Sequence, residues 1–234
     1  MICNIKRRSS GGVKVGTLDV GSIIQIAVDG TMKNFIVVNQ GVPGNNNLYG
    51  AGCDGTWMLM QDCSDTDSVY GPNTSGSKKS MPYAYSRLDT AMNTTFYARL
   101  SDKAKSAIFS AQIVVVDNDA TYQKLERYVF ALSLIETGFF QSEPMESIDY
   151  DGAKLEYFQM TNDASPLRIS NKNGVAHEWW MRSRPQGNGS GRVVTKNGGR
   201  TSWDSSSAAG VRPAFVLDPE TIVAKGSNNI YTLA

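Results

Sequence analysis

The sequence predicts one sheet-rich α+β domain. Three observations support this fold class: short β-branched runs alternate with turns along the 234 residues, one amphipathic helix pattern interrupts them near residue 90, and 41% hydrophobic residues are enough to close a sizeable core. Charged residues make up only 19%, so much of the polar surface must come from Ser, Thr, Asn and Gly.

A β-hairpin is the clearest local prediction. Residues 22–28 and 34–38 are β-branched runs, and Asp29-Gly30 between them is typical of a type I′ turn. The segment before them contains Ser9-Ser10-Gly11-Gly12, which predicts a flexible arm over residues 1–12.

Domain limits follow from this arm and from the absence of an internal linker. We expect a single globular domain over residues 13–222, and residues 223–234 are expected to add an edge strand or a tail.

The next segments predict a buried strand and two helices. Residues 56–60 form a short apolar run between polar loops at 41–55 and 64–82. Ser86 is a helix N-cap candidate, and Ser101 is a candidate N-cap for a second, shorter helix. The side chains expected to face inward from these two helices are Leu88, Met92, Phe96, Leu100, Ala104, Ala107 and Ile108.

The remaining chain is predicted to be mostly β-structure. Residues 113–116 form a strand closed by Asp117-Asn118-Asp119, whereas the apolar run 128–134 fits a strand or a helix equally well, and residues 141–175 are mostly irregular. The last third is predicted to hold strands at 178–183, 192–195 and 211–217, with turns at 187–190 and 196–199.

Charge and hydropathy argue against two classes of partner. A net charge of +1 provides no electrostatic footprint for nucleic acid. The basic run Lys6-Arg7-Arg8 is expected to be a solvated terminus, with contact to an acidic partner as the alternative. There is neither the apolar core of a signal peptide nor a stretch near the ~18 apolar residues that span a bilayer, so we expect no membrane partner and synthesis in the cytoplasm.

The cysteines and the single histidine predict neither a cofactor nor an enzyme. Cys53 and Cys63 are expected to be buried thiols or a hairpin disulfide, and Cys3 lies in the arm. His177 lacks an evident nucleophile partner and is expected to end a strand. The spacing identifies no catalytic pair among the candidate carboxylates Glu136, Glu143, Glu146 and Asp149.

No metal site is expected. The clustered carboxylates Asp62, Asp65 and Asp67, like Asp117 and Asp119, are interpreted as turn formers, with calcium as the alternative.

Three segments together carry a family resemblance. They are the N-terminal hairpin followed by Cys53-Asp54-Gly55-Thr56-Trp57-Met58-Leu59, the helix motif from Ser86 to Phe96, and the closing motifs Trp179-Trp180-Met181-Arg182-Ser183 and Gly210-Val211-Arg212-Pro213-Ala214-Phe215. The chain resembles a domain family of unknown function that is frequent in prophages and phages of Gram-positive gut bacteria. The closing motifs are also similar to those of C-type-lectin-fold proteins. This resemblance implies a C-type-lectin-like fold with small twisted antiparallel sheets, flanking helices and long loops.

Two activities of C-type-lectin-fold proteins do not carry over. Formylglycine-generating enzymes use cysteines near the C-terminal core, but here all three lie within the first 63 residues. Calcium-dependent lectins use a Glu-Pro-Asn loop, and Glu143-Pro144-Met145 departs from it at the third position.

The motif residues are interpreted as structural. Adjacent tryptophans on a strand point to opposite faces, and the two arginines are expected to tie strands to loop carbonyls or to carboxylates such as Glu178 and Asp218. We expect the indoles and the late arginine–proline strand to share one buried sheet. The structural set comprises Trp57, Trp179, Trp180, Arg182, Arg212, Pro213 and Phe215.

Residues 184–209 are the predicted binding region. They are rich in Gly, Ser, Asn and Arg and hold one aromatic anchor, a combination typical of binding loops, with an ordinary solvated loop as the alternative. The predicted ligand-binding residues are Arg184, Asn188, Arg192, Asn197, Arg200 and Trp203.

The resemblance and the polar composition lead to a functional hypothesis. The chain is expected to be a phage virion accessory protein that decorates the capsid or tail and binds a host surface protein or glycan. Residues 1–12 are expected to contact other virion proteins, and a homo-oligomer is compatible with this role. The alternative is a structural cement or assembly protein without a host ligand.

Overall fold

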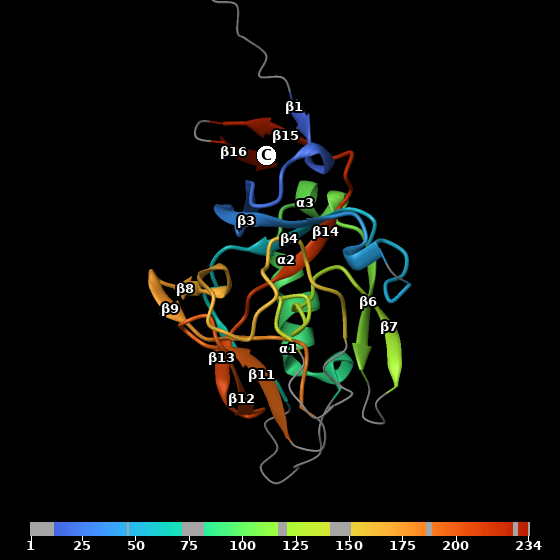
Figure 1. The fold of residues 1–234 in the computed structure, drawn as a ribbon. Coiled ribbons are helices and arrows are strands. Elements are labelled where there is room, and N and C mark those ends of the chain that lie inside the picture. Colours follow the sequence, from blue (N-terminus) through green and yellow to red (C-terminus); the bar gives the residue numbers. More distant parts are fainter. Residues whose placement is uncertain are drawn as a thin grey trace, which may run out of the picture.

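The computed structural model describes residues 12–45, 47–71, 82–116, 121–140, 151–185, 189–226 and 229–233. These residues form a sheet-rich α+β fold with a seven-stranded sheet, a five-stranded sheet, two further hairpins and a group of short helices (Figure 1). Within the described ranges, 3₁₀ turns connect the elements at Val15–Thr17, Pro43–Asn45, Tyr83–Tyr85 and Pro166–Arg168.

The larger sheet joins the two ends of the described chain. Its strands run in the order β1 (Gly12–Lys14), β15 (Ile222–Lys225), β16 (Ile230–Leu233), β2 (Ile23–Val28), β3 (Thr31–Gln40), β4 (Thr56–Met60) and β14 (Ala214–Leu217). All neighbours are antiparallel except β16 and β2. The resemblance implies small antiparallel sheets, whereas this sheet has seven strands and includes one parallel pair.

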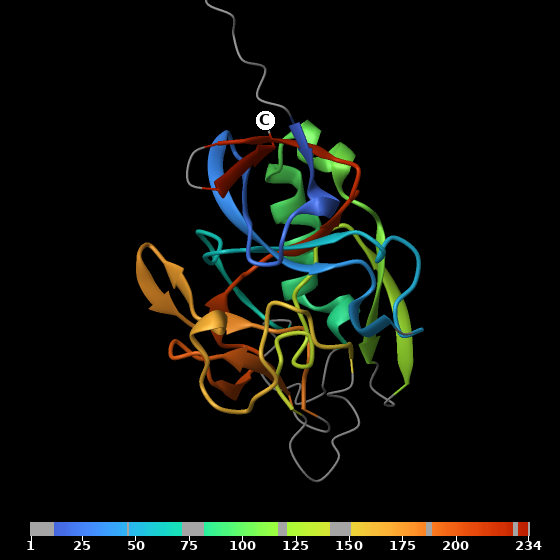
Figure 2. The same cartoon turned by 45° about the horizontal axis from the view of Figure 1, so that its top comes forward.

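The C-terminal segment differs from its prediction. Residues 223–234 were expected to add an edge strand or a tail, but β15 and β16 lie between β1 and β2 inside the sheet (Figure 2). Val223 and Leu233 are buried, so these strands cover part of the core. The predicted limit after residue 222 would cut through β15.

The β2–β3 hairpin confirms the type I′ prediction. Asp29 and Gly30 have φ angles of 48° and 72°, the left-handed values that this turn requires. Ile24, Ile26 and Val28 are buried on one face of β2, and the alternate side chains lie on the other face. This other face of β2 forms part of the floor of a groove that is described below.

The helices also begin where the sequence predicts. α1 (Arg87–Thr90), a π-helical turn (Ala91–Phe96) and α2 (Tyr97–Arg99) follow one another, and α3 (Asp102–Ala107) comes next. Ser86 Oγ accepts a hydrogen bond from the Asp89 amide, and Ser101 Oγ accepts one from the Ala104 amide. All seven side chains predicted to face inward are buried.

The smaller sheet contains the paired tryptophans. Its order is β12 (Arg200–Asp204), β11 (Ser190–Val194), β10 (Trp179–Trp180), β13 (Ala208–Gly210) and β5 (Asp67–Val69). β5 lies in a segment predicted to be loop, and β10 is much shorter than the strand predicted there.

The single-sheet expectation is wrong for the late arginine–proline strand. Gly210 pairs with Trp179 in the smaller sheet, but Ala214–Leu217 pairs with β4 in the larger one. Residues 211–213 pass between the sheets. Pro213 has no N–H to donate to a ladder, which favours an interruption at this point.

The two tryptophans pack into different cores, as their alternation predicts. Trp180 belongs to the main hydrophobic core, and Trp179 belongs to a second, small cluster with Cys63, Leu134, Phe139, Met181 and Val194. The sheet that carries them therefore has a buried core on each face.

Two hairpins lie outside the main sheets. β6 (Ala111–Val116) pairs with β7 (Tyr122–Arg127), and β8 (Ser170–Lys172) pairs with β9 (Val175–His177) in a segment predicted to be irregular. The apolar run 128–134 is neither strand nor helix: Phe130 makes one bridge to Ala214. The predicted turns at 117–119 and at 187 and 188 lie outside the described residues, as do residues 141–150.

Candidate functional site

A closed polar cluster surrounds Arg182, which is fully buried. Its five N–H groups all have acceptors: Nη1 and Nη2 donate to the two carboxylate oxygens of Glu136 at 2.5 and 2.6 Å, and the other three donate to backbone carbonyls. Burial opposes the charged guanidinium, but the Glu136 carboxylate outweighs it and raises the pKa of Arg182.

Glu136 and Asp151 complete this cluster. Tyr49 Oη and the Ser133 amide donate to the Glu136 carboxylate at 2.8 and 2.9 Å. Ser183 Oγ donates to Asp151 at 2.8 Å. These hydrogen bonds join segments that are far apart in the sequence, which is the geometry of a structural lock.

Arg168 and Arg212 donate to backbone carbonyls, and within the described residues neither has a carboxylate hydrogen-bond partner. Arg168 donates to six backbone carbonyls between residues 137 and 198, and its guanidinium lies 3.6 Å from the centre of the Phe139 ring. Arg212 donates to the carbonyls of Met60, Gln61 and Arg168. Burial lowers the pKa of each guanidinium to about 10.

The predicted structural set is buried throughout. Arg182 and Arg212 contact loop carbonyls, but the carboxylate of Arg182 is Glu136 rather than Glu178 or Asp218. Trp57 Nε1 donates to the Cys53 carbonyl. The buried members of the set are Trp57, Trp179, Trp180, Arg182, Arg212, Pro213 and Phe215.

The predicted binding residues do not form one surface. Arg184 is only 2% exposed and is thus part of the interior, which corrects its assignment to a ligand-facing loop. Trp203 lies edge-on to Trp180. Its side chain is on one face of the β11–β12 hairpin, and the side chains of Arg192 and Arg200 are on the opposite face. Strand alternation therefore separates Trp203 from Arg192 and Arg200, which lie on the same face of the β11–β12 hairpin.

Asn197 and Asn188 are the remaining asparagines of the predicted binding set. Asn197 Oδ1 accepts hydrogen bonds from Thr195 Oγ1 and from the Gly199 amide, so it shapes the β11–β12 turn. Asn188 lies outside the described residues. Arg192 Nη1 donates to Ser202 Oγ across the hairpin at 2.8 Å.

The cysteines and clustered carboxylates show no catalytic or metal arrangement in the described part of the chain. Cys53 and Cys63 are free, buried thiols, and burial raises the pKa of Cys53 to about 12. Asp62, Asp65 and Asp67 point to different partners, and no group of three potential metal ligands converges within the described residues. His177 Nε2 lies 3.1 Å from Asp67 Oδ1 on the β8–β9 hairpin.

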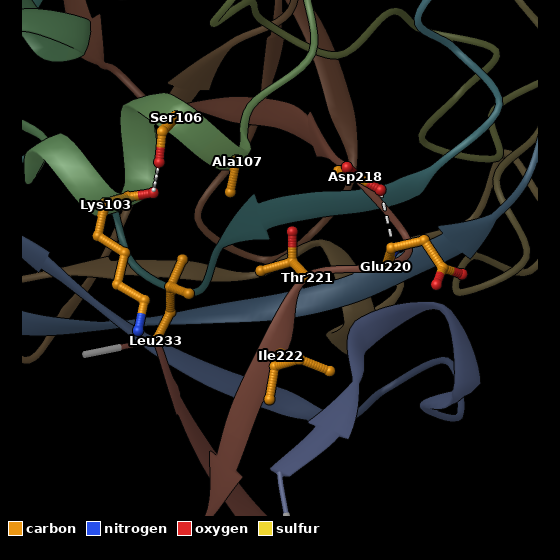
Figure 3. Close-up of a pocket in the computed structure, with 8 residues that line it drawn as sticks. All are labelled: Lys103, Ser106, Ala107, Asp218, Glu220, Thr221, Ile222 and Leu233. Carbon is orange, nitrogen blue, oxygen red and sulfur yellow. Dashed lines mark hydrogen bonds between the residues drawn. The ribbon is translucent and has the colours of Figure 1, made fainter.

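A hollow of about 320 Å³ lies between α3, the turn before β15 and the end of β16 (Figure 3). Its polar groups mainly serve their own elements: Ser106 Oγ donates to the Lys103 carbonyl, Asp218 accepts from the Glu220 amide, and Glu220 pairs with Lys14. These groups are therefore already engaged, which makes this hollow a poor polar binding site.

A polar groove lies instead on the outer face of β2, β3 and β4. It consists of two adjoining hollows of about 230 and 440 Å³ that share Gln61 and Asp62. The segment 166–174, which includes β8, forms the opposite wall. We call these two hollows the groove. Its other principal lining side chains are Ile23, Gln25, Met32, Lys33, Asn34, Ile36, Asp65, Tyr157, Leu167, Asn171 and Arg212.

A row of side-chain amides crosses the floor of the groove. Gln25 Nε2 donates to Asn34 Oδ1 at 3.2 Å, and Asn34 Nδ2 donates to Gln61 Oε1 at 3.2 Å. Asp62 Oδ1 accepts from the Asn171 amide and from Asn171 Nδ2, which fixes the carboxylate beside the row. The arrangement is a pre-ordered set of donors and acceptors that a polar ligand can bind without reorganising the site.

Charges around the groove largely compensate one another. Lys33 pairs with Asp65 at 3.4 Å, Asp65 also meets Arg99 at 3.5 Å, and Arg99 pairs with Asp29 at 2.6 Å. The Arg212 guanidinium is directed at backbone carbonyls. The groove therefore presents hydrogen-bonding groups without a dominant charge, which favours a neutral polar ligand.

Sequence reasoning missed this groove because its residues are scattered over several segments of the chain. One signal was present: Gln25 interrupts an otherwise aliphatic strand, and Asn34 occupies the paired position on β3. A polar pair at matching positions of a predicted hairpin indicates that this face of the sheet is exposed to solvent.

None of the helices in the described ranges is both long and apolar enough to cross a bilayer. The DUF6273 family, a domain of unknown function, matches residues 54–219, which is more than half of the chain. The chain therefore belongs to the DUF6273 family. No curated protein and no solved structure matches it.

Proposed function

We propose that this domain is a non-enzymatic recognition module that binds a neutral glycan of a host surface in the groove. The observation that carries the proposal is the amide row Gln25–Asn34–Gln61 beside the fixed Asp62 carboxylate. Side-chain amides and carboxylates present paired donors and acceptors, and neighbouring sugar hydroxyls offer the matching donors and acceptors. The compensated charge of the groove supports an uncharged ligand.

A binding experiment on the intact protein tests this function. Isothermal titration with purified cell-wall polysaccharide of a Gram-positive bacterium is expected to show saturable binding, and Asn34→Ala is expected to weaken it about tenfold by breaking the amide row. Gln123→Ala on the exposed strand β7 is the matched control and should bind as the wild type does. Absence of saturable binding at high protein concentration contradicts the proposal and favours the structural cement role.

The setting of this function is proposed as a phage particle. Its support is the motif resemblance described above, with residues 1–12 as the contact to other capsid or tail proteins. Mass spectrometry of purified particles is expected to detect the chain in stoichiometric amount. Its absence from particles overturns the virion location but leaves glycan binding open to the titration.

We further propose that the fold is a variant of the C-type-lectin type. Mostly antiparallel sheets, short helices and long irregular segments support this assignment, together with the pairing of the first described strand, β1, with β15. Superposition of an experimental structure on C-type-lectin domains tests it. A different strand order in the shared sheets would remove the assignment.

A further inference from the structure

We propose that the two hollows of the groove are successive subsites for one linear, neutral oligosaccharide of at least two sugar residues. This inference rests on the proposed function, because it names the class of glycan that the same groove takes.

The first argument is continuity. Ile23 pairs with Ile36 at the floor of the smaller hollow, and Gln25 pairs with Asn34 at the floor of the larger one. These pairs are two residues apart on the same face of the hairpin, which corresponds to about 7 Å along the strand. The step is comparable to the width of one sugar ring, so adjacent rings of a chain would meet adjacent pairs.

The second argument is the difference in chemistry between the hollows. The smaller hollow has a mostly polar lining that includes Gln61, Asp62 and Arg212, and it adds the Tyr157 ring with Ile23 and Leu167, side chains that can contact the C–H face of a sugar ring. The larger hollow offers the amide row, which suits the hydroxyl edge. A chain that occupies both would use apolar contact for one ring and hydrogen bonds for the next.

The third argument is the shared boundary. Gln61 and Asp62 line both hollows. Both hydrogen bonds from Asn171 end on Asp62 Oδ1, so Oδ2 is left to accept a hydroxyl from either side. An acceptor at the junction can bind a single ligand that extends from one hollow into the other. This favours one continuous ligand over two separate small ones.

A chain-length series tests the inference. Titration of the full chain with N-acetylglucosamine oligomers of one to six residues, and with size-fractionated wall polysaccharide, is expected to show affinity that rises at least about tenfold from one to four residues and then levels off. Equal affinity for the monosaccharide and for the longer oligomers overturns the two-subsite inference while leaving glycan binding intact.

Two variants separate the subsites. Tyr157→Ala and Asn34→Ala are each expected to weaken oligosaccharide binding about tenfold, whereas only one of them should affect a bound monosaccharide. Tyr157→Phe, which keeps the ring, should restore most of the affinity, and thermal melting checks that each variant is folded. Tyr85→Ala, at a side chain 75% exposed and outside the groove, is the matched control.

The outcomes distinguish the two claims. If only one variant weakens binding of long oligomers, the ligand occupies one hollow and the inference is wrong. If no sugar of any length binds, the proposed function itself fails and the two-subsite inference falls with it.

Discussion

The closed cluster around Arg182 and the open groove over β2–β4 contain similar polar groups but use them differently. In the cluster, all five guanidinium N–H groups end on protein acceptors and the residues are buried. In the groove, the amide row is partly buried, and both hydrogen bonds from Asn171 end on a single oxygen of Asp62, Oδ1. A saturated polar cluster stabilises one conformation, whereas unsaturated groups at a surface remain available to a ligand.

This difference explains why the Trp-Trp-x-Arg-Ser motif does not contain the candidate site. Trp179 and Trp180 fill opposite cores, and Arg182 fixes loops that approach from residues 114, 131 and 151. These contacts stabilise the fold. The groove lies elsewhere, on the outer face of the seven-stranded sheet. The predictions below separate stability from binding, starting with the largest expected effect.

Removing the carboxylate from the closed cluster should destabilise the fold most. Glu136→Ala leaves the buried charge of Arg182 without its partner, and the expected loss is about 3–5 kcal/mol in the free energy of unfolding. Urea denaturation followed by tryptophan fluorescence measures it. Glu178→Ala, at the carboxylate that the sequence indicated as the partner, should change stability by less than about 0.5 kcal/mol. Similar losses in both variants would contradict the assignment of Glu136.

Replacing Arg168 with lysine should have a smaller but clear effect. Arg168→Lys keeps the charge but loses the planar fork that reaches six carbonyls and stacks on Phe139, and we expect about 2–3 kcal/mol of destabilisation. The same denaturation experiment measures this variant. An unchanged midpoint would show that the carbonyl contacts are not needed.

A groove variant should weaken glycan binding more than it lowers stability. Asn34→Ala is expected to cost about 1 kcal/mol in stability, since its hydrogen bonds are only partly buried, while glycan affinity falls about tenfold. Titration and denaturation of the same sample compare the two effects. A large stability loss with unchanged affinity would place Asn34 among the structural residues instead.

The smallest expected effect is a local pH dependence at the β8–β9 hairpin. Burial alone would raise the pKa of Asp67, but hydrogen bonds and charge from Lys172 and His177 bring it below the ordinary 3.8. The Asp67 pairs therefore support the hairpin above about pH 4, and this support is lost as the pH falls through the lower folded value. Amide signals of residues 170–177 should broaden or shift as the pH falls below about 4. Asp67→Asn should remove the transition, and its persistence in that variant would assign it to another group.

Local signals in the sequence predicted much of the framework. Ser86 and Ser101 cap helices as their positions indicate, and Asp29-Gly30 forms its turn, because each depends on residues close in sequence. The Asn173-Gly174 turn carried the same kind of signal and was passed over. Its φ values of 53° and 78° match the turn type that this dipeptide favours.

Long-range pairing set the limit on prediction. Glu136 and Arg182 meet across 46 residues, and β16 joins β2 from the opposite end of the chain. The spacing of these residues in the sequence does not predict these contacts. The groove was missed for the same reason, since Gln25, Gln61 and Asn171 come together only after the sheet has formed.

Side-chain amide NMR on the intact protein tests the central claim most directly. During titration with wall oligosaccharides, the account predicts that the NH₂ signals of Gln25, Asn34 and Gln61 shift together and saturate, while backbone signals around Arg182 stay in place. Shifts confined to the β11–β12 hairpin, or none at saturating ligand, would contradict it.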